Sequence, residues 1–124
     1  MKEIKTRNAP QAIGPYSQGV LSNGFLFVSG QIPVDPATGV FVPGGIREQT
    51  KQVLINTQAI VEAAGLSMSQ VVKATVYLAN MDDFVSMNEV YTSFFSPPFP
   101  ARAAFQVAKL PKDALVEIEL ILSK

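Results

Sequence analysis

The last segment of this 124-residue chain alternates between two kinds of side chain. Every second position is a large apolar residue, and the positions between them include two glutamates: Val116, Ile118, Leu120 and Leu122 share one side, and Glu117 and Glu119 share the other with Leu115 and Ile121. A period of two is typical of a β-strand that buries one face. This strand therefore belongs to a sheet that packs against other elements on one side.

A second alternating segment, Arg102 to Ala108, precedes this strand. Its side chains divide into Ala103, Phe105 and Val107 on one face and Arg102, Ala104 and Gln106 on the other. We expect the two strands to pair as an antiparallel hairpin joined by residues 109–114, with their apolar faces matched. This pairing would place Arg102, Glu117 and Glu119 on the same side of the sheet.

The earlier elements are predicted from turn residues and helical spacing. Asn23 and Gly24 join two β-prone runs, which is a strong hairpin signal. Apolar residues recur at helical spacing from Ile46 to Ala64, and Gly65 ends the predicted helix. Further elements are expected as follows: a short turn over 67–70, a buried strand over 71–78, and a second helix that begins near 80–83 and ends before Pro97.

This order of elements predicts an α+β fold with a mostly antiparallel sheet and both helices on one face. The length and the 48% hydrophobic content predict a single domain over residues 1–124. The other face of the sheet is then uncovered. Because it would mix charged with apolar side chains, it is a candidate for contacts between subunits or for a site at their boundary.

The absence of Cys, His and Trp limits the chemistry of the chain. It excludes disulfides, thiol nucleophiles, His-containing catalytic triads and the usual zinc sites. Carboxylates, Lys, Tyr, Arg, hydroxyls and backbone groups remain. Any catalysis should therefore depend on a carboxylate or an arginine.

The charge balance bears on partners and location. Ten basic and ten acidic residues give a net charge of zero, which argues against a nucleic-acid partner. Charged residues make up only 16% of the chain, against roughly 25% in average proteins, so we expect part of the surface to be buried between copies; a sticky monomer is the alternative. Polar and Gly or Pro residues interrupt the uncharged stretch 8–34, so no membrane span is predicted, and without a targeting signal the cytoplasm is the default location.

Arg102 and the two glutamates are the main candidates for chemistry. A rigid proline-rich loop precedes Arg102, whose fork of donors suits a carboxylate ligand; the alternative is a cross-strand ion pair with Glu117 or Glu119. One glutamate could act as a general base or orient water, and the alternative is a polar stripe on an edge strand. Lys73 could form a Schiff base only in principle, because it lies among β-branched residues.

Two polar patches among apolar runs are weaker candidates. They are the segments 14–19, with Tyr16, and 29–31, with Gly30. Glycine lets the backbone approach a ligand closely, and Tyr16 could donate a hydrogen bond. The alternative is an ordinary turn and a strand end.

Several motifs, in order along the chain, resemble the RidA/YjgF family. They are Asn8-Ala9-Pro10, the run Ala12 to Gly19, Ser29-Gly30-Gln31-Ile32-Pro33, Glu62-Ala63-Ala64-Gly65, and Pro100-Ala101-Arg102 through Leu110-Pro111-Lys112-Asp113 to Val116-Glu117-Ile118-Glu119. The resemblance implies a chorismate-mutase-like fold assembled as a homotrimer with clefts between subunits. It also implies hydrolysis of 2-imino acids such as 2-iminobutanoate and 2-iminopropanoate to 2-oxo acids, without cofactor or metal. The substrates would come from pyridoxal-phosphate dehydratases.

The resemblance also assigns roles to single residues. Arg102 matches the arginine that binds the substrate carboxylate, and Glu117 matches the glutamate that orients water. Tyr16 is expected among the catalytic residues, and Ser29, Gly30 and Asn88 among those that bind substrate. Many family members have Cys where this chain has Ala104, which we expect to keep a backbone contact with the ligand.

Two alternative hypotheses assign the protein a function other than imine deamination. In the first, the same trimeric cleft binds a small carboxylate, such as a 2-oxo acid, and signals to a partner without significant turnover. In the second, proposed for some relatives, the protein is a ribonuclease or translation inhibitor. The zero net charge and the absence of His argue against metal-free RNA cleavage.

Overall fold

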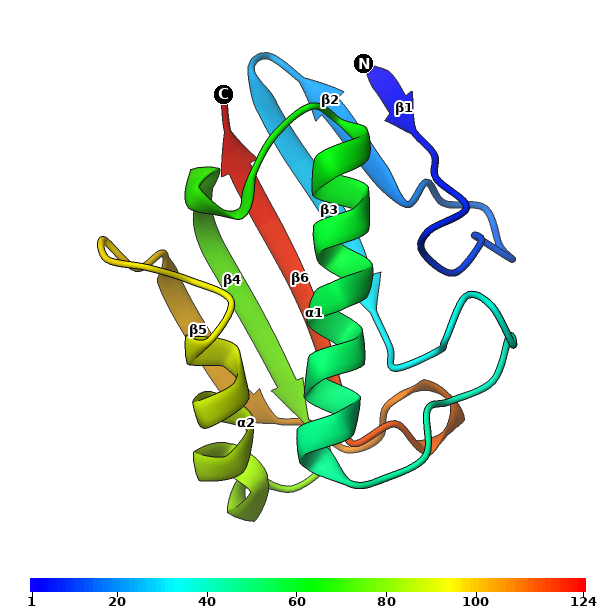
Figure 1. Ribbon diagram of the computed structural model, residues 1–124, viewed down its shortest axis with the longest axis vertical. Helices are drawn as coiled ribbons and strands as arrows, with labels where there is room; N and C mark the ends of the chain where they lie inside the picture. The colour runs from blue at the N-terminus through cyan, green and yellow to red at the C-terminus, as the bar shows by residue number, and fades with distance from the viewer.

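The computed structural model describes residues 1–124 as one mixed sheet with two helices on the same face (Figure 1). The strands are β1 (Lys2–Ile4), β2 (Gly19–Ser22), β3 (Phe25–Gln31), β4 (Val71–Leu78), β5 (Ala101–Gln106) and β6 (Val116–Ser123). The helices are α1 (Ile46–Ala63) and α2 (Phe84–Thr92), with short 3₁₀ turns η1 (Met68–Gln70), η2 (Met81–Asp83) and η3 (Pro111–Asp113). The predicted α+β class is confirmed, although β1 was not foreseen.

The local turn and helix predictions are confirmed. β2 and β3 form an antiparallel hairpin around Asn23 and Gly24, whose φ angles of 52° and 79° suit a tight hairpin turn. Helix α1 ends just before Gly65, which takes the left-handed φ of 76° that commonly follows a helix. The short turn predicted over 67–70 is η1, where the Gln70 side chain accepts a hydrogen bond from the Ser67 backbone N–H at 3.0 Å.

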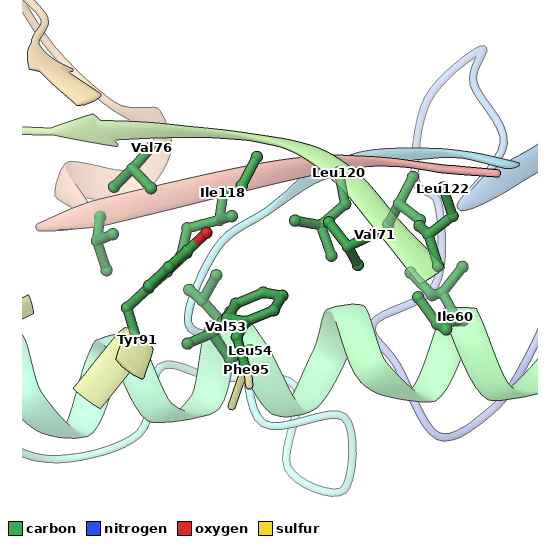
Figure 2. Close-up of a cluster of buried hydrophobic side chains, with 14 of the residues drawn as sticks. Val53, Leu54, Ile60, Val71, Val76, Tyr91, Phe95, Ile118, Leu120 and Leu122 are labelled. Atoms are coloured by element: carbon green, nitrogen blue, oxygen red, sulfur yellow. The ribbon is translucent and has the colours of Figure 1, made fainter. Parts of the chain in front are cut away.

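The core lies between α1, α2 and the covered face of the sheet (Figure 2). Leu54 and Ile60 of α1 meet Val76 of β4 and Ile118 and Leu120 of β6, and all five are almost completely buried. Each such side chain contributes about 1.5–3 kcal/mol relative to exposure. The alternation of β6 therefore matches its burial, with apolar residues inside and Glu117 and Glu119 on the other face.

The predicted hairpin between the last two strands is wrong. The sheet order is β1-β2-β3-β6-β4-β5, so β6 lies between β3 and β4, and β5 is the edge strand. β5 pairs with β4 in parallel, because the chain between them crosses over through α2. The connection after β5 then passes to the far side of β4, where β6 runs antiparallel to it. β5 and β6, which are consecutive in sequence, are therefore not neighbours in the sheet.

The expected common face for Arg102 and the glutamates is also wrong. Arg102 is in register with buried Ala74 of β4, which places it on the helix side, and Gln106 lies on that side opposite Leu78. Glu117 is in register with Tyr77, on the open side. The assumption that the apolar faces of the two strands lie on the same side was wrong, because Phe105 faces the open side. There its ring packs edge-on against Tyr77, with the ring centroids 5.3 Å apart.

The open face carries exposed aromatic residues beside the two glutamates. Phe25, Phe27 and Phe105 keep 42–46% of their surface exposed in the single chain. Neither α1 nor α2 has the length and apolar character that a membrane crossing requires. The helices cover only the other face of the sheet (Figure 1).

Candidate functional site

Apart from Ala104, the predicted site residues fall into two groups, one for each side of the sheet. A cavity of about 760 Å³ is lined by Tyr16, Ser29, Gly30, Glu117 and Glu119, among other residues. A smaller hollow of about 390 Å³ is lined by Asn88 and Arg102, together with Tyr91, Thr92, Phe99 and Pro100. We call these the glutamate cavity and the arginine hollow. Within a single chain the structure does not bring them together.

In the glutamate cavity, the carboxylate of Glu117 lies against the backbone of Gly30. The register of β3 with β6 shifts between Val28 and Gln31, and Gly30 lies within this bulge. A Cβ atom at position 30 would be 2.9 Å from the Cδ of Glu117, closer than side chains normally approach. Any larger residue at position 30 would therefore move the Glu117 carboxylate from this place.

Burial and charge both act on Glu117. Its side chain is half-buried at the wall of the cavity, and this desolvation raises the pKa of the carboxyl group above its usual value. The neighbouring charge of Glu119 raises the pKa of Glu117 further. A carboxyl group with a raised pKa is better matched to proton transfer near neutral pH than an ordinary surface glutamate.

Glu119 has a specific partner on the adjacent strand. The hydroxyl group of Tyr77 donates a hydrogen bond to its Oε1 atom. This bond, followed by burial and the negative charges of Glu119 and Glu117, raises the pKa of Tyr77 to about 12. Tyr77 therefore remains a neutral donor at any physiological pH. The interpretation of the glutamates as an exposed stripe on an edge strand is wrong, since β6 is central.

Hydrogen bonds from Ser29 and Gln18 hold the other wall of the cavity. The Ser29 hydroxyl donates to the Ser17 carbonyl at 2.6 Å, and the Ser29 backbone N–H donates to the Gln18 carbonyl at 3.0 Å. Gln18, only 3% exposed, donates to the Pro10 carbonyl at 2.7 Å and accepts from the Thr6 N–H at 2.8 Å. These bonds fix the loop that carries Tyr16, a residue that is 51% exposed and lines the cavity.

In the arginine hollow, Arg102 is held by α2 through an amide and two aromatic rings. Its Nη1 donates to Oδ1 of Asn88 at 2.5 Å. Its guanidinium carbon lies 4.8 Å from the ring centre of Tyr91 and 5.4 Å from that of Phe84. Such cation–π contacts favour a fixed guanidinium without neutralising it. Arg102 forms no ion pair with a carboxylate, so the predicted cross-strand pair is wrong.

The support under Arg102 reaches into the core. Figure 2 shows the ring of Tyr91 directed from α2 toward Ile118, and the residue is only 4% exposed. Burial raises the pKa of the Tyr91 hydroxyl, while the nearby Arg102 charge opposes this shift. A ring anchored in the core gives the guanidinium a rigid base. Four further donors of Arg102 remain for a ligand.

Three residues that support the site were not identified from the sequence, and one predicted residue lies outside both the glutamate cavity and the arginine hollow. Phe84 and Tyr91 were placed only within the second predicted helix, and Tyr77 within a buried strand; no local signal separates their roles at the site from ordinary packing. Ala104 packs against the hydrophobic core and lines neither the glutamate cavity nor the arginine hollow. Its contact with a ligand stays a prediction.

Fold and site define a small α+β protein that presents an unpaired arginine on one side of its sheet and an acidic cavity on the other. The sequence profile described as Endoribonuclease L-PSP matches residues 6–123. A RutC family protein of Pyrococcus horikoshii is 57% identical over 125 residues, covering 100% of this chain and 99% of that protein. The 2-iminobutanoate/2-iminopropanoate deaminase of Bos taurus is 54% identical, covering 97% of this chain and 88% of that protein.

Solved structures agree along the whole length. Escherichia coli TdcF with bound serine superposes with a TM-score of 0.95 at 46% identity and covers 100% of this chain and 99% of its own. RidA from the Antarctic bacterium Psychrobacter sp. gives a TM-score of 0.96 at 46% identity, with 100% of both chains covered. This protein belongs to the RidA/YjgF family.

Proposed function

We propose that this protein is a homotrimeric deaminase that hydrolyses 2-imino acids, with each site formed where two subunits meet. The observation that carries the proposal is the separation of Arg102 from Glu117. Neither residue has a partner of opposite charge from its own chain that would complete a site. The Arg102 guanidinium has no counter-ion, and the glutamate cavity contains no arginine. A heterologous contact in a ring of subunits would join the arginine hollow of one to the glutamate cavity of the next.

The open face of the sheet supports such an assembly. Its aromatic side chains Phe25, Phe27 and Phe105 surround a surface that the helices do not cover. Burying this apolar area against other copies is favourable. The low content of charged residues, 16%, is consistent with a surface that is partly buried between subunits.

In the proposed reaction, Arg102 binds the substrate carboxylate through paired hydrogen bonds and Asn88 fixes its orientation. The imine carbon then lies over the glutamate cavity, where Glu117 orients the attacking water and Tyr16 donates a hydrogen bond. Ser29, Gly30 and Ala104 would complete the substrate contacts. The reaction needs no cofactor, since the imine carbon is already electrophilic. Pyridoxal-phosphate dehydratases release such imines and would supply the substrate.

The relatives support the chemistry. Relatives from Bos taurus, Mus musculus and Homo sapiens carry the name 2-iminobutanoate/2-iminopropanoate deaminase at 51–54% identity. The E. coli TdcF structure holds serine, whose carboxylate and nitrogen are attached to the same carbon, as they are in the proposed substrate. Both facts favour a ligand that binds to Arg102 through its carboxylate.

A subunit-mixing experiment tests the proposal. Arg102→Ala removes the side chain that binds the substrate carboxylate, and Glu117→Gln removes the carboxylate that orients water. Each variant alone should therefore lose the activity. If each site draws Arg102 from one subunit and Glu117 from the next, refolding an equal mixture should restore about a quarter of wild-type activity. Activity is followed as the loss of semicarbazone formation when a threonine dehydratase generates the imine.

The controls decide between the alternatives. Mixing wild type with Arg47→Ala, an exposed arginine that pairs with Glu89, should leave full activity. No recovery from the inactive pair would contradict a shared site, since each subunit carries one lesion. If wild type itself is inactive but binds a 2-oxo acid through Arg102, the protein is instead a small-carboxylate binding module.

A further inference from the structure

We propose that Glu119, held by Tyr77, is a positioning residue that acts through Glu117 and makes Glu117 the proton-exchanging group of the reaction. This inference rests on the proposed deaminase function. It gives a role to Tyr77, which the sequence placed only in a buried strand, and a definite role to Glu119, which was one of two candidate glutamates. Glu119 and Tyr77 need not touch the substrate, because their effect passes through the charge state of Glu117.

The geometry places the three groups on one side of the sheet. Glu117 and Glu119 are two residues apart on β6, so their side chains project from the same face, and both line the glutamate cavity. Tyr77 stands opposite Glu117 in the β4–β6 pairing and reaches diagonally to donate to Glu119. The Phe105 ring packs edge-on against Tyr77 and limits its movement.

This hydrogen bond gives the two carboxylates different environments. Glu119 accepts a hydrogen bond from the Tyr77 hydroxyl, whereas no side-chain donor bonds to Glu117. Gly30 brings Glu117 against backbone and so removes water from it. Two neighbouring carboxyl groups whose environments differ in this way can take separate acid and base roles.

The other charged or titratable groups near Glu117 are few. Lys112 lines the same cavity from η3, and Tyr16 lines it from the N-terminal loop. On β4, Lys73 lies on the same face of the sheet as Tyr77 but is in register with Ile121, farther along the strand. The residues of β3 at the cavity, Ser29, Gly30 and Gln31, do not titrate. Glu119 is therefore the nearest like charge on its own strand, and it raises the pKa of Glu117 together with burial.

The protons balance as follows. Glu117 takes a proton from water as the water oxygen bonds to the carbon of the iminium acid and the π electrons move to nitrogen. The carboxyl group returns this proton to the nitrogen, and the C–N bond breaks with its electron pair on the departing ammonia. The new hydroxyl becomes the 2-oxo group, and its proton passes through Glu117 to ammonia. The products are the 2-oxo acid and ammonium.

The test measures the titration of Glu117 directly by NMR of carboxyl-labelled glutamate in wild type, Glu119→Gln and Tyr77→Phe. The pKa of Glu117 should fall in Glu119→Gln, because the like charge is gone, and fall less in Tyr77→Phe, where Glu119 is released to solvent. In both variants the rising limb of kcat against pH should move to lower pH. The maximal kcat should drop roughly tenfold in Glu119→Gln, since Glu117 becomes a weaker base.

A matched control is Glu62→Gln, which removes an exposed glutamate whose only side-chain bond is with Gln58. It should leave the Glu117 titration and the pH profile unchanged. An unchanged Glu117 titration in Tyr77→Phe and Glu119→Gln would overturn the inference. If Glu119→Gln does not fold, Tyr77→Phe alone decides. The titration does not need turnover, so an inactive wild type would count against the deaminase while the coupling of the carboxylates is still measured.

Discussion

The arginine hollow and the glutamate cavity hold opposite charges by opposite means. Arg102 is exposed, its guanidinium contacts the rings of Tyr91 and Phe84, and its only side-chain hydrogen bond is to the neutral amide of Asn88. Glu117 is half-buried against a glycine backbone, next to a second carboxylate. The arginine therefore keeps its charge and its free donors, whereas the glutamate is placed where losing or gaining a proton is easy.

This difference suggests a division of labour. A guanidinium that is fixed but not neutralised suits binding, which affects KM. A carboxyl group that is partly desolvated suits proton transfer, which affects kcat. Substitutions in the two regions should thus give different kinetic signatures.

The largest effect within the glutamate cavity is expected from Gly30→Ala. The added Cβ would displace the Glu117 carboxylate, so kcat should fall roughly 100-fold, a much larger change than the rise in KM from the altered substrate contact. Steady-state kinetics with the coupled dehydratase measure both constants. Gly45→Ala is the matched control, because a Cβ at that position meets nothing within 4 Å, and it should keep wild-type kinetics. A rise in KM with unchanged kcat in Gly30→Ala would contradict the division of labour.

A smaller effect of the opposite kind is expected from Phe84→Leu, beside Arg102. Loss of one ring weakens the cation–π support of Arg102, so KM should rise about three- to tenfold with kcat within a factor of two. Phe94→Leu, which shortens a partly buried ring with no cation–π contact to Arg102, is the control and should leave KM unchanged. Equal losses of kcat in both variants would indicate general destabilisation instead.

The smallest expected effect is on the stability of the fold, and it tests the environment of the Glu117 carboxyl group. Because folding raises the pKa of Glu117, this group favours the folded state at low pH and loses that contribution as pH rises through its folded pKa. Glu117→Gln should therefore raise the thermal unfolding midpoint by roughly 1–3 °C at pH 8 and less at pH 4. Differential scanning calorimetry at both pH values measures this, and equal shifts would show that charge is not the cause.

Local features of the fold could be predicted because they depend on neighbours in sequence. The turn at Asn23-Gly24, the helix that ends before Gly65 and the buried face of β6 each follow from backbone preferences or from a period of two or 3.6. The position of β5 could not be predicted this way. Matching apolar faces selected the wrong neighbour, because Phe105 packs on the open face and the α2 crossover makes β5 parallel to β4.

The candidate site, too, could be predicted only in part from the sequence. The motifs of the chain pointed to Arg102 and Glu117, but strand alternation assigned them to one face, and the structure places them on opposite sides of the sheet. The roles of Phe84, Tyr91 and Tyr77 depend on which strand lies next to which helix, and no spacing in the sequence encodes that.

The sequence by itself determined the chemical groups, the local elements and the family, because these depend on residue identity and short-range periodicity. Only the tertiary structure decided the sheet order, the separation of the arginine from the glutamates, and the contacts that hold each charge. These depend on long-range pairing of strands, where the crossover of the chain and the packing of whole faces outweigh the preference of any single segment.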